Sequence, residues 1–299
     1  MKWFSSAPRK ILLLTPALLV YLSYVIAPIL IAIQYSTTKF SGIGEPQPVG
    51  LANYARLLDD PLFWIALKNT AIVLIVTLLI LIPGAFGLAL LLKRSTRIMP
   101  FIRAANYAPS IIAPILVGLI WVFILDPQIG LINQLLNAAG LGSLAQAWIG
   151  GDSLTPFSLA IVQSWQSLGY IATIFIAGMT LIPPELYEAA DLDGATGWKK
   201  TLHITVPLLN ETFKMNTILV ITLVFKIFET VLQLTNGGPN HKSELLVTYM
   251  YYTAFTAGEY GYGMAIATAT LAITLLSAGL ILSVPALRRV FTRKKARNV

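Results

Sequence analysis

Long, uninterrupted apolar stretches constrain this chain more than any other feature of its sequence. Several of them exceed the roughly 18 residues that a helix needs to cross the hydrocarbon core of a membrane. Only 11% of the 299 residues are charged, whereas a typical soluble domain carries about 25%. A soluble fold would therefore lack the polar surface to cover its core, and we expect an all-α, polytopic membrane protein.

Six transmembrane helices are predicted from these stretches, at about 11–33, 64–92, 104–125, 156–182, 207–234 and 260–285. The first is longer than the 7–15 residue apolar core typical of a signal peptide, so we expect it to stay as an anchor. Short surface helices are predicted in the two longer loops, at 53–58 and 132–139. No repeat or linker divides the chain, and residues 1–299 are expected to form one integral domain.

The net charge of +8 is distributed unevenly along the chain. Given the predicted spans, fifteen Lys and Arg residues fall on one side of the membrane, and four fall on the other: Lys39, Arg56, Lys68 and Lys242. Basic residues concentrate in cytoplasmic loops. Both termini are therefore predicted to be cytoplasmic, and the positive charge is attributed to topology rather than to nucleic-acid binding.

No catalytic or metal-binding pattern is recognisable. The sequence contains no cysteine, and its two histidines, His203 and His241, fall in loops on opposite sides of the predicted membrane. Residues 194–201 echo a phosphate-binding loop, but the motif requires glycine at position 199, which is lysine. We expect this chain to be no enzyme and to hold no nucleotide or other cofactor of its own.

A charged segment at 183–207, between the fourth and fifth spans, is predicted to lie in the cytoplasm. Pro183 and Pro184 end the fourth span, because proline lacks an amide hydrogen and disfavours helix in the preceding residue. A short helix is predicted to follow at 185–190. Gly194 is free to adopt a positive φ angle, which suits a helix stop, and Pro207 opens the fifth span. Such a segment is accessible to a soluble partner.

The spacing of this segment resembles the E-A-A-x3-G-x9-I-x-L-P loop of permease subunits of bacterial ABC importers. Six positions fall in register, with Val206 in place of the leucine: Glu188, Ala189, Ala190, Gly194, Ile204 and Pro207. The resemblance implies the fold of type I importer permeases. It also implies that this loop, with Asp193 inside it, couples the chain to an ATPase subunit that binds ATP and Mg²⁺.

Other stretches resemble carbohydrate permeases of the maltose and glycerol-phosphate type, above all L-T-N-G-G-P at 234–239. This second resemblance implies an ATP-driven importer of a sugar or sugar-like solute in the bacterial cytoplasmic membrane. The implied partners are a second permease subunit, two copies of an ABC ATPase and an extracytoplasmic solute-binding protein. A stand-alone secondary transporter or channel for a small polar solute is the alternative, but no inverted repeat supports it.

A polar stripe on the fourth span is the candidate solute path. Its four residues follow helical i, i+3, i+4, i+7 spacing: Gln163, Gln166, Ser167 and Tyr170. Their amides, hydroxyl and phenol suit a sugar, although hydrogen bonding between helices is the alternative use of such residues. The resemblance to maltose-type permeases implies sugar contacts at these positions and, on the fifth span, at Val220, Leu223 and Val224.

Lys226 and Glu229 are the opposite charges deepest inside a predicted span. At i, i+3 spacing they can meet on one face of a helix. Pairing would be the least costly way to bury both charges, so a structural ion pair is expected. A role in lining the solute path is the alternative.

Overall fold

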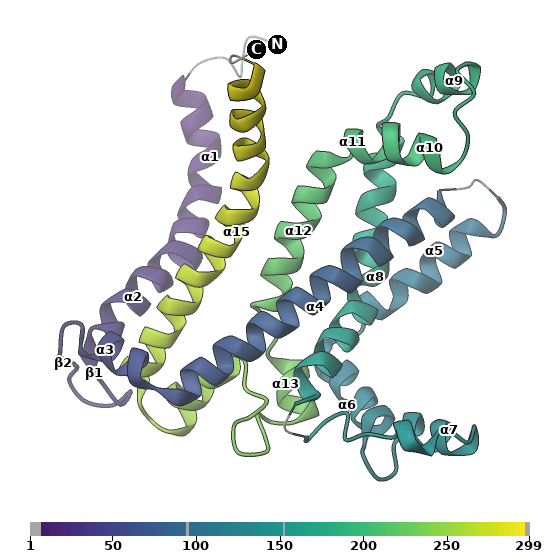
Figure 1. The fold of residues 1–299 in the computed structure, drawn as a ribbon. Helices are drawn as coiled ribbons and strands as arrows, with labels where there is room; N and C mark the ends of the chain where they lie inside the picture. Colours follow the sequence, from purple (N-terminus) through teal and green to yellow (C-terminus); the bar gives the residue numbers. More distant parts are fainter. Residues whose placement is uncertain (1–6, 94–95, 152, 297–299) are drawn as a thin grey trace. The chain divides into compact units, whose positions relative to one another are not determined.

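The structure is a computed structural model that describes residues 7–93, 96–151 and 153–296. These residues are mainly helical (Figure 1), which confirms the all-α fold class. The described residues contain one small antiparallel sheet, formed by β1 (Thr38–Lys39) and β2 (Gln47–Pro48). Three of the basic residues used to predict topology, Lys2, Arg94 and Arg297, lie outside the described residues.

Four described helical segments are long and apolar enough to cross a membrane: Leu13–Ser36, Pro61–Leu92, Thr155–Thr180 and Tyr260–Ile281. They coincide with four of the predicted spans. A further candidate is the pair Met99–Ile111 and Pro114–Leu125, which is bent by 95° within the predicted span 104–125.

The predicted span 207–234 is broken into pieces in the structure. It is divided among α11 (Val206–Leu208), α12 (Asn210–Val224) and α13 (Glu229–Leu234). Pro207 thus lies near the end of a helical stretch that runs from Trp198 to Leu208, and the longer helix begins after Leu209. The sequence therefore located this region as helical but did not predict its two interruptions.

The chain divides into two compact units. The first combines Met1–Phe63 with Tyr249–Ala272, and the second combines Trp64–Thr248 with Ile273–Val299. The expectation of one integral domain at 1–299 stays a prediction.

The first unit begins with a continuous helical segment made of α1 (Ala7–Tyr21), a π-helical turn (Leu22–Ile26) and α2 (Ala27–Ser36). The small sheet and the short helix α3 follow. From the later part of the chain it receives the end of α14 (Leu246–Tyr251), a π-helical turn (Tyr252–Thr256) and the start of α15 (Tyr260–Ala296). Helix α3 spans Ala52–Asp59 and confirms the predicted surface helix at 53–58.

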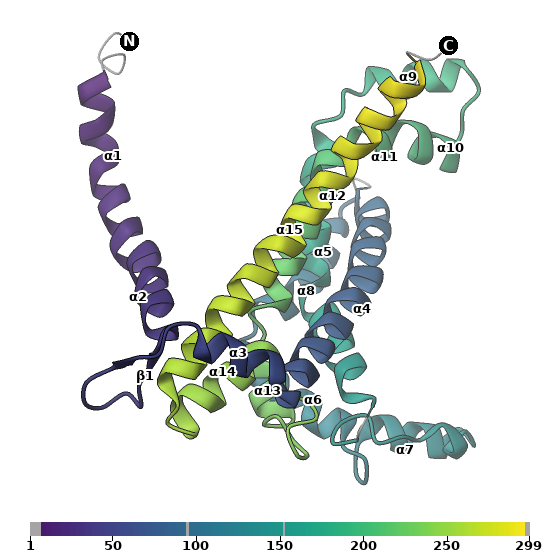
Figure 2. The ribbon, with the colours of Figure 1, turned by 60° about the vertical axis from the view of Figure 1, so that its left-hand side comes forward.

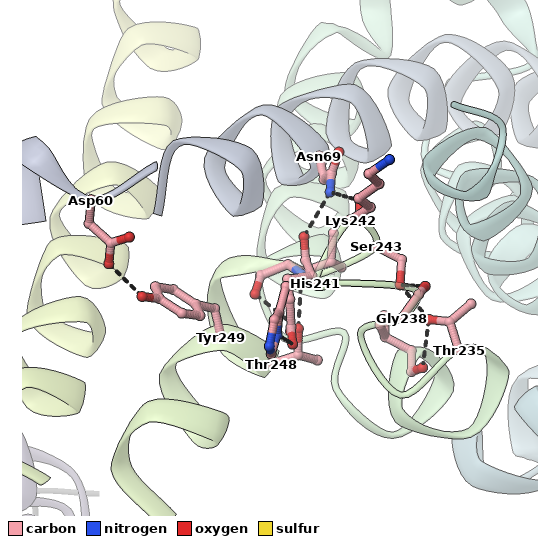
Figure 3. Close-up of polar contacts among 12 residues, drawn as sticks. Asp60, Asn69, Thr235, Gly238, His241, Lys242, Ser243, Thr248 and Tyr249 are labelled. Carbon is pink, nitrogen blue, oxygen red and sulfur yellow. Dashed lines mark hydrogen bonds and ion pairs between the residues drawn. The ribbon is translucent and has the colours of Figure 1, made fainter. Parts of the chain in front are cut away.

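Asp60 connects three segments of the first unit. Its carboxylate accepts a hydrogen bond from the hydroxyl of Tyr249 (Figure 3). It also accepts hydrogen bonds from the hydroxyl of Tyr262 at 2.5 Å and from the backbone amide of Leu62 at 2.9 Å. Burial by itself raises the pKa of Asp60, but these hydrogen bonds outweigh it and leave the pKa below the ordinary value of 3.8. Asp60 is therefore ionised at neutral pH and holds the two tyrosines in place.

The second unit contains the remaining helices. In chain order they are α4 (Pro61–Leu92, mostly in this unit), α5 (Met99–Tyr107), a 3₁₀ turn (Ala108–Ile111), α6 (Pro114–Leu125), α7 (Leu131–Ala138), a 3₁₀ turn (Gly142–Leu144), α8 (Thr155–Thr180), α9 (Glu185–Leu192), α10 (Trp198–Lys200), a π-helical turn (Thr201–Thr205) and then α11 to α13. Helix α7 confirms the predicted surface helix at 132–139. Helices α7 and α9 lie at opposite ends of this unit (Figures 1 and 2).

Close packing around α8 forms the core of the second unit. The ring of Phe175 lies 4.8 Å from that of Phe213 on α12 and 5.6 Å from that of Phe86 on α4. On the side of α5, Gly169 approaches the backbone so closely that an added Cβ would lie 2.0 Å from the carbonyl oxygen of Asn106. Glycine at 169 is required for this approach, which brings α5 and α8 together beside the candidate site.

Candidate functional site

A cavity of about 440 Å³ lies where two helix breaks meet in the second unit. The first break separates the turn after α5 from α6, at Ile112 and Ala113, whose backbone is extended. Pro109 and Pro114 flank it, and proline removes helical hydrogen bonds and disfavours helix in the residue before it. The second break lies between α12 and α13, and α13 packs along α6. Residues at both breaks line the cavity.

The predicted polar stripe of α8 forms one wall of this cavity. All four of its residues line the cavity, and Gln163, Gln166 and Ser167 are buried. The amide nitrogen of Gln163 donates to the Ser167 hydroxyl over 2.9 Å. The structure thus brings the stripe together at one polar site, as the helical spacing predicted.

Gln166 has a structural partner that the sequence did not reveal. Its amide nitrogen donates to the carbonyl oxygen of Ile112 over 3.1 Å. That carbonyl belongs to the break before α6, and a buried carbonyl left unpaired costs about 1–3 kcal/mol. Gln166 therefore stabilises the bend as well as lining the cavity.

The predicted contacts on the fifth segment are only partly found at the cavity. Leu223 lines it, whereas Val220 and Val224 are buried at 0% and 1% exposure in the apolar core. The three positions follow i, i+3, i+4 spacing on one side of α12, and Leu223 lies at the edge of this side that reaches the cavity.

Lys226 and Glu229 differ from the predicted ion pair. They flank the break between α12 and α13, and among the ion pairs of the described residues none joins them. Pairing at i, i+3 requires a continuous helix, and the helix is interrupted between these two residues. Both residues line the cavity and are exposed, which agrees with the alternative reading. Glu229 is also the first residue of α13, where the helix dipole favours an acid.

Tyr107 and Ser110 are cavity residues that the sequence analysis did not identify. Tyr107 lies at the end of α5, and the centre of its ring is 6.4 Å from that of Tyr170. Pro109 and Pro114 were the available signal, since they mark the break that turns this segment toward α8.

The segment 183–207 forms an exposed hairpin of short helices. Glu188 and Ala189 are exposed on α9, and Ala190 is half-buried. Asp193 ends α9, and Gly194 has a φ angle of +72°, which confirms the predicted left-handed stop. Near the end of the motif, Ile204 packs against the apolar core of the unit and Pro207 is exposed, so Ile204 attaches this end of the hairpin to the core.

Side-chain contacts hold this hairpin in one shape. Asp191 forms an ion pair with Lys200 across the turn. The Tyr187 hydroxyl lies 3.0 Å from that of Thr205, and the ammonium of Lys93 lies 4.4 Å from the centre of the Tyr187 ring. The hairpin is therefore anchored to the end of α4 and to the segment that leads into α12.

Large apolar side chains are exposed on the same hairpin. Leu192 is 91% exposed, and Trp198 is 64% exposed. Both side chains are therefore accessible to a partner protein, and neither was predicted from the sequence.

The loop after α13 is fixed to α4 by a polar network (Figure 3). The side-chain amide of Asn69 donates to the carbonyl oxygens of Lys242 and Glu244, over 2.7 and 3.0 Å. The Ser243 hydroxyl donates to Thr235 and lies 2.7 Å from the Gly238 carbonyl. The stretch L-T-N-G-G-P therefore belongs to a well-anchored loop whose Ser243 is buried.

Apolar spanning helices, a polar cavity at two helix breaks and an exposed, charged hairpin between two helices are together typical of a membrane transport subunit. The chain belongs to the family described as binding-protein-dependent transport system inner membrane component, whose model matches residues 92–297. It is thus a multi-pass permease subunit of an ABC importer and no enzyme, because ATP hydrolysis in these importers is carried by a separate subunit.

Similar proteins of known sequence agree with this family. The probable ABC transporter permease protein YurN of Bacillus subtilis is 40% identical over 267 residues, which cover 88% of this chain and 91% of YurN. The probable starch degradation products transport system permease protein AmyD of Thermoanaerobacterium thermosulfurigenes is 32% identical over 264 residues, with 88% and 89% covered.

A solved structure has the same fold. A chain of the bacterial alginate ABC transporter, crystallised in complex with alginate pentasaccharide-bound periplasmic protein, superposes with a TM-score of 0.79. The sequences are 21% identical, and the match covers 96% of this chain and 98% of the other. The likeness confirms the importer permease fold.

Proposed function

We propose that this permease carries a sugar or short glycan that an extracytoplasmic binding protein delivers. The observation that carries the proposal is the cavity between α8, the bend before α6 and the break before α13. Amide, hydroxyl, phenol and charged groups converge on it, as expected of a site for a small polar solute. The relative named for starch degradation products supports a carbohydrate.

Solute contacts are assigned to groups that keep free donors or acceptors. Tyr170 offers a phenol and a ring face, and Lys226 and Glu229 add a donor and an acceptor at the helix break. Gln163 and Ser167 retain hydrogen-bonding capacity beyond their mutual bond. Gln166 and Leu223 contribute mainly to the shape of the wall, and Val220 and Val224 support it from the core.

The hairpin at 183–207 is proposed to dock on an ATPase subunit and to transmit its ATP-driven closure. Its acidic residues Glu188 and Asp193, and its exposed apolar Leu192, offer a mixed surface suited to a cleft in a soluble partner. We propose an importer built from this chain, a second and different permease subunit, and two copies of the ATPase. ATP and Mg²⁺ are bound by the ATPase alone.

Uptake by the reconstituted importer tests this function. The chain is co-expressed with a second permease subunit, an ABC ATPase and a solute-binding protein from the same organism, and proteoliposomes are offered labelled oligosaccharides. Uptake is expected to require both ATP and the binding protein, and to fall to background without either. ATP-independent uptake by this chain alone would instead support the stand-alone transporter.

Both termini are proposed to be cytoplasmic. The excess of Lys and Arg in the loops on that side supports this orientation. The opposite positions of α7 and α9 in the second unit agree with one loop on each side of the membrane (Figure 2).

Cysteine labelling in intact cells measures the orientation. A cysteine replacing exposed Asn240 is expected to react with an impermeant thiol reagent, whereas one replacing exposed Thr196 reacts only after the cells are opened. Ser243 is unsuitable as the outer position because it is 1% exposed. The reverse pattern of labelling would refute the proposed topology.

A further inference from the structure

A second cavity, of about 320 Å³, lies in the first unit at the ends of two candidate membrane spans. Lys39, on its wall, follows shortly after Ser36, where the span Leu13–Ser36 ends. Tyr262, on the other wall, lies in the first turn of the span Tyr260–Ile281. The cavity is therefore at the depth where a membrane changes from hydrocarbon to headgroups.

Aromatic rings mark the same depth. The ring of Phe40 lies 5.1 Å from that of Tyr35 and 5.6 Å from that of Tyr260, and Phe255 lies 6.1 Å from Tyr260. Aromatic side chains concentrate at membrane–water interfaces, where their apolar rings and polar edges are both accommodated. This cluster is an independent sign of interfacial position.

The walls of the cavity are held firmly by hydrogen bonds. The side-chain amide of Asn53 donates to the carbonyl oxygens of Ser36 and Thr38, each over 2.8 Å, and so attaches α3 to the end of α2. The amide of Gly261 donates to the Phe40 carbonyl over 2.9 Å. The cavity is thus a preformed feature of this unit.

The charge of the cavity favours an anion. Arg56 pairs with Glu259 at 2.7 Å and lies over the ring of Tyr262, so the acid on this wall is already neutralised. Lys39 is exposed, and among the ion pairs of the described residues none includes it. Two of the four basic residues predicted on the outer side of the membrane therefore line one cavity, although basic residues are disfavoured in loops on that side.

We propose that this cavity binds the phosphodiester headgroup of an anionic phospholipid. The Lys39 ammonium pairs with the phosphate, and the guanidinium N–H groups of Arg56 that Glu259 leaves free donate to it. The acyl chains lie along α2, whose Leu30 and Ile31 are 60% and 49% exposed. A lipid fits better than a free anion because the cavity lies just beyond the end of the apolar helix α2, at interfacial depth.

Native mass spectrometry of the purified full-length chain tests the proposal. The protein is titrated with phosphatidylglycerol and, separately, with phosphatidylcholine. A basic residue near an anionic lipid contributes about 1 kcal/mol, which is about fivefold in affinity. Lys39→Gln is therefore expected to weaken phosphatidylglycerol binding about fivefold and to leave phosphatidylcholine unchanged. Lys68→Gln, which removes an exposed lysine outside the cavity, is the matched control and should have no effect.

Three outcomes would overturn the proposal. Equal effects of Lys39→Gln and Lys68→Gln would show that charge alone, and not the cavity, retains the lipid. Displacement of phosphatidylglycerol by an equal concentration of soluble glycerol phosphate would show a site for a free anion. Unchanged phosphatidylglycerol binding by Lys39→Gln would show that the cavity does not hold the headgroup.

Discussion

Gly194→Val is expected to abolish ATP-driven uptake while the chain still inserts into the membrane. Gly194 has a φ angle of +72°, a region that costs a β-branched residue about 1–3 kcal/mol. An added Cβ would meet no atom within 4 Å, so the strain comes from the backbone and not from crowding. The turn is expected to rearrange, and α9 would then present its docking surface in the wrong direction.

Uptake and ATP hydrolysis in proteoliposomes measure this effect. Gly194→Asn is the matched control, because asparagine tolerates the left-handed region and should retain most of the transport. Glu188→Lys, which reverses an exposed charge on α9 without straining the backbone, is also expected to uncouple uptake from ATP. Normal uptake by Gly194→Val or Glu188→Lys would contradict the assignment of this hairpin as the coupling element.

Tyr170→Ala is expected to raise the half-saturation concentration for uptake roughly 5- to 150-fold. Loss of a polar contact that leaves its partner unpaired costs about 1–3 kcal/mol, which corresponds to this range. Hydrolysis of ATP stimulated by the binding protein should persist, because Tyr170 belongs to the cavity wall and not to the hairpin. Uptake over a range of solute concentrations measures the change.

Thr173→Ala is the control for this prediction. Thr173 lies on the same helix but is exposed and outside the cavity, so its replacement should leave half-saturation unchanged. Gln166→Ala should behave differently from Tyr170→Ala: it frees the Ile112 carbonyl, so thermal stability in detergent falls together with uptake. Wild-type half-saturation in Tyr170→Ala would refute the proposed solute site.

Local sequence patterns were sufficient for much of this molecule. Apolar length identified the helices Pro61–Leu92 and Thr155–Thr180, because the need to satisfy backbone groups in lipid leaves helix as the outcome. Helical periodicity placed Gln163 and Tyr170 on one face, since that relation depends on the helix alone. Gly194 was predicted to take a positive φ, because its conformational freedom is a property of the residue itself.

The way in which the broken segments come together at one site depends on tertiary packing. The stretch 225–228 contains neither proline nor glycine, so no local signal predicts the interruption that separates Lys226 from Glu229. It accompanies the packing of α13 on α6, which is so close that an added Cβ at Gly118 would lie 2.8 Å from the Cβ of Gln233.

Tertiary packing also determines which partners individual side chains have. Gln166 reaches the Ile112 carbonyl, and Val220 turns into the core while Leu223 faces the cavity. Helix length, helix face and turn conformation depend on neighbouring residues and were therefore determined by the sequence itself. Contacts between distant segments determine which carbonyl an amide pairs with and where a helix is interrupted. Those contacts exist only once the chain is folded.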